Sequence, residues 1–106
     1  MTTFDAREKG YENKFAHDEE LRFKATARRN KLLGAWAGEK LGLSGPSLDQ
    51  YAKDVVLADL TEIGDDDVVR KILADFEGKK VVTSEDTVRS VMADLMIKAI
   101  AQIEAA

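Results

Sequence analysis

The residue types that carry out most protein chemistry are scarce in this chain. Its 106 residues contain no cysteine and a single histidine, His17. Without cysteine there is no thiolate metal ligand and no cysteine nucleophile, and one histidine cannot form a His/Cys metal cluster. His17 precedes Asp18 and Glu19 and could titrate near neutral pH. A solvated helix residue is the simpler interpretation.

Three consecutive acids, Asp65, Asp66 and Asp67, follow Gly64 and invite comparison with a cation site. The glycine and glutamate positions that complete a calcium-binding loop are missing. Asp65 as the N-cap of a helix, with the next two acids near its positive end, accounts for all three without a metal. The sequence therefore predicts no metal site here.

Residues 42–45, with the sequence GLSG, lack the lysine of a phosphate-binding loop and are better interpreted as a turn between helices. No serine stands in the context of a nucleophile elbow. The sequence thus predicts no catalytic residue and no cofactor. An enzyme is the weakest functional class for this chain.

Charge is distributed unevenly along the chain. The net charge is −4, with −3 in residues 1–20, +5 in residues 21–41 and −6 in residues 42–106. An acidic body argues against nucleic-acid binding, which needs a basic face on the domain. The basic segment faces either an acidic partner or the acidic helices of its own fold. Both interpretations remain open from the sequence.

The chain has the length of a single domain with one modest core. No apolar run approaches the roughly 18 residues of a membrane span. The N-terminus lacks the apolar stretch of a signal peptide. We therefore expect a cytoplasmic protein that does not insert into a membrane.

The element that must organise these residues is a long amphipathic helix, predicted over residues 15–41. Its main apolar stripe recurs at steps of four and seven residues and comprises Leu21, Ala25, Leu32 and Trp36. Leu33 and Ala37 widen the stripe, as in a helix packed in a bundle. Trp36, the only tryptophan, should be largely buried between helices. Residues 21–31 carry five bases and no acid.

A second helix is predicted to begin at the turn 44–47, with Ser44 or Ser47 as its N-cap. Ser47 and Gln50 have the spacing of a capping box. The last apolar residue of this helix is Ile63, and the helix should close near Gly64.

A short third helix follows the acids, with Gly78 as the C′ residue just past its end. A fourth helix is capped by Thr83 or Ser84 and carries apolar residues at steps of three and four to Ile103. Four helices joined by short loops predict an all-α, four-helix bundle in an antiparallel arrangement. We expect it to span residues 17–106.

The N-terminal segment differs from this bundle. Phe4, Tyr11 and Phe15 share one helical face, but this stripe lies about 70° from the main stripe of the long helix. A short helix with no packing partner is marginal in water. Residues 1–16 are therefore predicted to be a mobile arm. It is either a frayed terminus with incidental aromatics or a segment that folds on a partner.

The sequence also resembles a known family. Residues 14–34, KFAHDEELRFKATARRNKLLG, are similar to the N-terminal signature of the zeta subunit of alphaproteobacterial F-type ATP synthases. Residues 64–79, GDDDVVRKILADFEGK, are similar to the third-helix region of that family. The length agrees along essentially the whole chain. Residues 81–83, VVT, depart from the shorter, more polar loop expected and leave the conformation of that loop open.

The resemblance implies a four-helix bundle whose N-terminal arm inhibits ATP hydrolysis by the F1 sector, a role that makes the protein a regulator and not an enzyme. The arm would become helical in a catalytic α/β interface, reach the central stalk and block rotation. The protein would then be cytoplasmic and associated with the membrane-bound synthase through F1. The expected contact residues of the arm are Phe4, Arg7, Tyr11, Lys14 and Phe15.

Secondary contacts are expected from three bases of the long helix, Arg22, Arg28 and Arg29. The alternative function uses the same region differently. In it the chain is a small helical adaptor that binds an acidic or phosphate-rich partner through residues 22–31. Some members of the family are linked to nucleotide binding, but no residue pattern here places such a site.

Overall fold

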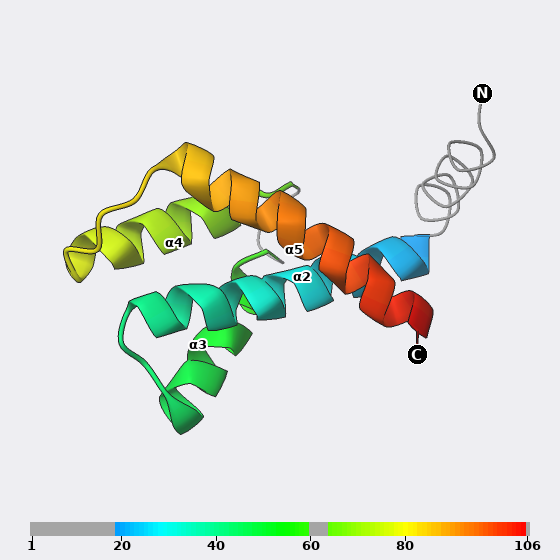
Figure 1. Cartoon of the computed structure of the whole chain (residues 1–106), viewed down its shortest axis with the longest axis horizontal. Helices are drawn as coiled ribbons and strands as arrows, with labels where there is room; N and C mark the ends of the chain where they lie inside the picture. Colours follow the sequence, from blue (N-terminus) through cyan, green and yellow to red (C-terminus); the bar gives the residue numbers. More distant parts are fainter. Residues whose placement is uncertain (1–18, 60–63, 106) are drawn as a thin grey trace.

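The computed structural model describes residues 19–59 and 64–105, which form four helices and no strand (Figure 1). The all-α, four-helix fold is therefore confirmed. The helices are α2 (Glu19–Lys40), α3 (Gly45–Ala58), α4 (Asp66–Gly78) and α5 (Glu85–Ala105). The arm predicted over residues 1–16, and with it His17, lies outside the described residues.

Helix α2 is the central element, and it packs most extensively against α3 and α5. Two glycines set the approach of α3. A Cβ atom on Gly34 would lie 2.6 Å from the backbone Cα of Ala52, and one on Gly38 would collide with the Leu48 side chain. The backbones of α2 and α3 can therefore approach closely only because these two positions lack side chains.

The buried face of α2 is rotated relative to the predicted stripe. Leu33 and Ala37, expected at its edge, are fully buried, whereas Leu32 and Trp36 are only partly buried. The glycine contact with α3 draws the neighbouring positions 33 and 37 inward. Trp36 packs on Phe76 with ring centroids 5.7 Å apart. The expectation that Trp36 is largely buried is thus only partly met.

The core lies where α2, α3, α4 and α5 meet. Its fully buried large side chains come from all four helices and include Leu33, Val55, Val68, Val69, Ile72, Phe76 and Val88. Removing each such side chain from water contributes roughly 1.5–3 kcal/mol. Helices α4 and α5 supply apolar residues at steps of three and four, as the sequence predicted.

Two helices end in the same hydrogen-bonded motif. After α2, the N–H of Leu43 donates to the carbonyl of Gly38 at 2.9 Å, and Gly42 has a φ of 84°. After α4, the N–H of Val81 donates to the carbonyl of Phe76 at 2.8 Å. The residue with positive φ is there Lys80, at 59°. Gly78 is the last helical residue, so its predicted C′ role is wrong.

The ends of α3 also differ from expectation. Ser44 is the N-cap residue, but its side chain makes no capping hydrogen bond. Gln50 donates to Asp54 at 2.9 Å instead of completing a capping box with Ser47. Helix α3 ends at Ala58, before the predicted end near Gly64. Ile63, assigned to this helix from the sequence, lies outside the described residues.

Helix α5, the predicted fourth helix, is capped by Ser84, one of the two residues predicted for this role. The N–H of Thr87 donates to the Ser84 hydroxyl at 3.1 Å, a capping bond that satisfies one of the first free N–H groups of α5. Residues 81–84 connect α4 to α5 without regular structure. Val81 packs against the core, while Val82 is 98% exposed.

Candidate functional site

The most unusual polar feature is Arg29, a charged residue that is only 4% exposed. Its guanidinium donates two hydrogen bonds to the Asp65 carboxylate, at 2.7 and 3.1 Å, and two to Asn30 Oδ1, at 2.8 and 3.1 Å. Asp65 is the N-cap residue of α4, as predicted, but its side chain makes no capping bond. Its carboxylate binds Arg29 across the fold instead.

Asn30 extends this cluster toward the end of α3. Its side chain is almost fully buried, and its Nδ2 atom has no hydrogen-bond partner within the described part of the chain. Burial raises the pKa of the Asp59 carboxyl above its ordinary value of 3.8, although the positive charge of Arg29 opposes the rise. The cluster therefore joins α2 to the segments at both ends of the α3–α4 connection.

Arg29 was predicted to be a secondary partner contact, but in the folded bundle its side chain is buried against Asp65. A guanidinium with almost no exposed area and a bidentate carboxylate partner cannot reach another protein unless the bundle opens. The interpretation in which the fold neutralises part of its own basic segment is correct for this residue. The sequence carried the signal, because Arg29 lies four residues from both Ala25 and Leu33, which are buried.

The other two basic candidates of α2 are exposed. Arg28 donates to Gln102 Oε1 of α5 at 3.3 Å, so it also ties the two helices together. Arg22 lies in the first turns of α2. The five arm candidates, Phe4, Arg7, Tyr11, Lys14 and Phe15, lie outside the described residues, and their role stays a prediction.

The three consecutive acids at the start of α4 are each engaged by a different arginine. Asp65 binds Arg29, Asp66 accepts from Arg89 at 2.9 Å, and Asp67 accepts from Arg70. In residues 19–59 and 64–105 no group of three histidine, cysteine or acidic side chains has the arrangement of a metal site. These carboxylates organise the helix start and do not converge on a common point.

A second polar cluster fastens α3 to α4. The Tyr51 hydroxyl donates to Asp75 at 2.7 Å, and the Lys71 ammonium donates to the same carboxylate at 3.0 Å. Lys71 also lies 5.0 Å from the centre of the Tyr51 ring. Burial and the neighbouring carboxylate raise the pKa of Tyr51 well above its ordinary range. The phenol therefore stays a neutral donor, and the role of this cluster is structural.

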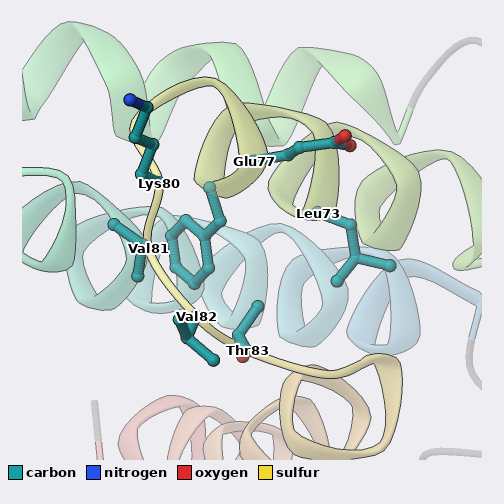
Figure 2. A pocket seen from close by; sticks show the side chains of 7 residues that line it. Leu73, Glu77, Lys80, Val81, Val82 and Thr83 are labelled. Carbon is teal, nitrogen blue, oxygen red and sulfur yellow. The ribbon is translucent and has the colours of Figure 1, made fainter.

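Two shallow cavities lie among the described residues. One, of about 490 Å³, lies at the end of α4 and is lined mainly by apolar side chains (Figure 2): Leu73, Phe76, Glu77, Lys80, Val81, Val82 and Thr83. The other, of about 290 Å³, lies beside Arg29, Asp65 and Arg89. The lining of the first contains one acid, Glu77, with Lys80 and Thr83, but no histidine and no second acid. The arginines of the second are already paired with acids. Neither has the groups of a catalytic site.

No helix in the described part of the chain is both long and apolar enough to cross a membrane. The fold thus defines a small all-α bundle in which charged side chains form ion pairs and hydrogen bonds between the helices. The comparisons with known proteins agree with this class. The family model described as ATPase inhibitor subunit zeta matches residues 1–102. The chain belongs to this family, which supports a regulatory role as an inhibitor of ATP synthase.

Solved structures add to this assignment. One solution NMR structure is 47% identical in sequence and superimposes with a TM-score of 0.71. The similarity covers 80% of this chain and 96% of that chain. No curated protein matches the sequence.

Proposed function

We propose that this protein inhibits ATP hydrolysis by the F1 sector of a bacterial F-type ATP synthase, with residues 1–16 as the inhibitory segment. The arm would fold as a helix in a catalytic α/β interface and reach the central stalk, where it blocks rotation in the hydrolytic direction. The observation that carries the proposal is the family match, which begins at residue 1 and so includes the arm. Through F1, the protein would associate with the membrane-bound synthase.

The composition of the arm fits insertion into a groove. Phe4, Tyr11 and Phe15 share one helical face, and Arg7 and Lys14 lie between them in the sequence. Aromatic and arginine side chains are the usual anchors of protein interfaces. Ordering the arm costs about 1–2 kcal/mol per backbone residue. In this proposal, contacts with the groove of F1 offset the cost when the arm folds there.

The bundle acts as the handle of the inhibitor in this proposal. Among the described residues, the buried core residues come from α2 to α5. The Arg29–Asp65 and Tyr51–Asp75 bonds join these helices without any residue of the arm. These contacts between the helices stabilise the bundle. Deleting the arm should leave it folded, and this separates the two parts experimentally.

The test is a comparison of the full chain with a variant that lacks residues 1–16. Both are assayed for inhibition of ATP hydrolysis by F1-ATPase of the same source, and both are melted by circular dichroism. We expect the deletion to abolish inhibition while the melting temperature changes by only a few degrees. Replacement of Phe4, Tyr11 and Phe15 together with alanine should weaken inhibition strongly, because truncated anchors commonly cost about 2 kcal/mol or more each.

Other outcomes identify the alternatives. Loss of both folding and inhibition would place the arm in the core of the bundle. Inhibition that survives the deletion would move the active surface to the basic residues of α2, as in the adaptor alternative. That alternative is weakened by the burial of Arg29, because one of the basic side chains of residues 22–31 is then not available at the surface. Binding to a phosphate-rich partner would also fall steeply as salt is raised.

A further inference from the structure

Val82 is the most exposed of the large apolar side chains among the described residues, with 98% of its surface open to solvent. It lies within residues 81–84, which connect α4 to α5 without regular structure. A single apolar side chain at the surface is ordinary in a folded protein. The exposure of Val82 becomes informative because an apolar cavity lies directly beside it.

The cavity beside Val82 is the one of about 490 Å³ at the end of α4 (Figure 2). Its apolar lining comes from Leu73 and Phe76 of α4 and from Val81. Val82 belongs to the rim of the cavity but does not fill it, because almost none of its own surface is covered. The cavity is large enough to accept a valine side chain from another molecule, and burial there removes the apolar surface of that side chain from water.

The rim of the cavity carries one charge of each sign. Glu77 and Lys80 both line it, and both residues are exposed. Figure 2 shows that the two side chains point away from each other, so they do not form an ion pair within one molecule. A two-fold axis that passes between two opposite charges places each of them against its opposite in a second copy. The rim is therefore self-complementary in charge.

The other charges around the cavity are also mixed. Residues 77–86 carry two bases and three acids, a net charge of −1. Arg70, one turn before Leu73 on α4, is paired with Asp67. A strongly acidic or strongly basic partner would meet unfavourable charges along with favourable ones, whereas a second copy presents the same nearly neutral surface. The charges therefore favour a second copy of this chain as the occupant of the cavity.

An exposed apolar side chain and a cavity that accepts it thus lie on the same patch of the molecule. Such a patch can pair with itself about a two-fold axis, which closes the assembly at two copies. We propose that this chain forms a dimer through the end of α4, with Val82 of each copy in the cavity of the other and Lys80 of each copy facing Glu77 of the other. Seven residues line the cavity, against roughly 20–30 residues on each side of a standard interface. The dimer is therefore weak and depends on concentration.

The dimer goes beyond the proposed function and does not depend on it. In Figure 1 the end of α4 and the connection to α5, drawn in yellow, lie at the opposite end of the molecule from the start of α2, drawn in blue. The contact therefore does not involve the start of α2. Dimerisation and inhibition of F1-ATPase are measured separately, so the failure of one proposal does not decide the other.

The first test measures the dissociation constant of the dimer by sedimentation equilibrium, at concentrations up to about 1 mM because a small interface is weak. The unmodified full chain is compared with Val82→Ser and with Ile97→Ser. Ile97 is a matched control, because it is an apolar residue of α5 with 71% of its surface exposed. We expect Val82→Ser to raise the dissociation constant about tenfold or more, whereas Ile97→Ser changes it by less than about twofold. Circular dichroism melts verify that both variants are folded.

A charge exchange provides an independent readout. Lys80→Glu alone places acids against each other in the dimer, and Glu77→Lys alone places bases against each other. Each single variant should therefore dimerise about three- to tenfold more weakly than the unmodified chain, and this loss should shrink as salt is raised. When the two variants are mixed in equal amounts, both contacts of the mixed pair again join opposite charges. We expect the mixture to regain the association of the unmodified chain, which variants with a merely destabilised fold would not do.

The remaining outcomes overturn the proposal. An unmodified chain that stays monomeric at about 1 mM does not form the dimer. A dimer that Val82→Ser leaves intact, or that Ile97→Ser disrupts instead, has its interface elsewhere. Mixed charge variants that fail to regain association would show that Lys80 does not face Glu77 of the second copy. If the chain is monomeric and Val82→Ser weakens inhibition of F1-ATPase, the cavity binds a segment of F1 and not a second copy.

Discussion

Arg29 and Asp65 form a bidentate ion pair that joins the middle of α2 to the first residue before α4, with the shorter N–O distance at 2.7 Å. The arginine side chain is 5% exposed and the aspartate 41%. Water can therefore reach one partner but hardly the other. The pair orders the α4 start from across the bundle, and this explains why the Asp65 side chain makes no capping bond of its own.

Asp65→Ala should lower the free energy of unfolding by about 2–4 kcal/mol, because it leaves a buried guanidinium without its counter-charge. Chemical denaturation monitored by circular dichroism measures this loss. Asp66→Ala is the matched control, since Asp66 is 64% exposed and pairs with Arg89 at the surface. It should cost about 1 kcal/mol or less. Equal losses for the two variants would contradict the structural role of the Arg29–Asp65 pair.

Gly34→Ala should destabilise the bundle by about 1–3 kcal/mol, because the new Cβ would lie 2.6 Å from backbone at Ala52. This cost outweighs the gain of about 1 kcal/mol that alanine normally brings to a helix. Gly78→Ala, at the end of α4, is the control, since a Cβ there meets nothing within 4 Å. It should be neutral or slightly stabilising. If denaturant melts showed that Gly34→Ala is more stable than Gly78→Ala, the close contact of α2 and α3 would be ruled out.

Lys80→Gly should raise the free energy of unfolding by about 0.5–1 kcal/mol. Lys80 has a φ of 59°, a conformation that costs a residue with a Cβ about 1–2 kcal/mol but costs glycine little. The neighbouring Lys79, with a φ of −101°, provides the control. Lys79→Gly gains no relief and should lose about 0.5–1 kcal/mol. If both variants changed the free energy of unfolding by the same amount, the turn would not strain Lys80.

The raised pKa of Asp59 predicts a specific pH dependence of stability. Because the folded state holds this proton more tightly than the unfolded chain, the contribution of Asp59 is most favourable at acid pH. It is lost as pH rises from the ordinary value of 3.8 through the raised value in the fold. Asp59→Asn cannot titrate, so it should become more stable relative to the native chain across this window.

Urea melts of both proteins at a series of pH values measure this difference. The other carboxylates are common to the two proteins, so their contributions largely cancel in the comparison. A relative stability that does not change with pH, or that changes in the opposite direction, would show that burial does not dominate the titration of Asp59.

Local rules acting along the chain determined the main features of the fold. Apolar spacing and end signals placed four helices, and Asp65 and Ser84 stand at the helix starts as predicted. These features depend on a few neighbouring residues, and a sequence displays them directly. The basic segment and the family signature were likewise visible, and the family match confirmed the latter.

Tertiary packing decided what the local pattern left open. Leu32 and Leu33 are neighbours in an amphipathic pattern, and only the approach of α3 to Gly34 and Gly38 selected Leu33 for the centre. Arg29 has the same sequence character as Arg28, yet one is buried on Asp65 and the other is exposed beside Gln102. A charged side chain enters a core only where the fold supplies its counter-charge. That partner is 36 residues away in the sequence, so three-dimensional proximity determined the role of Arg29.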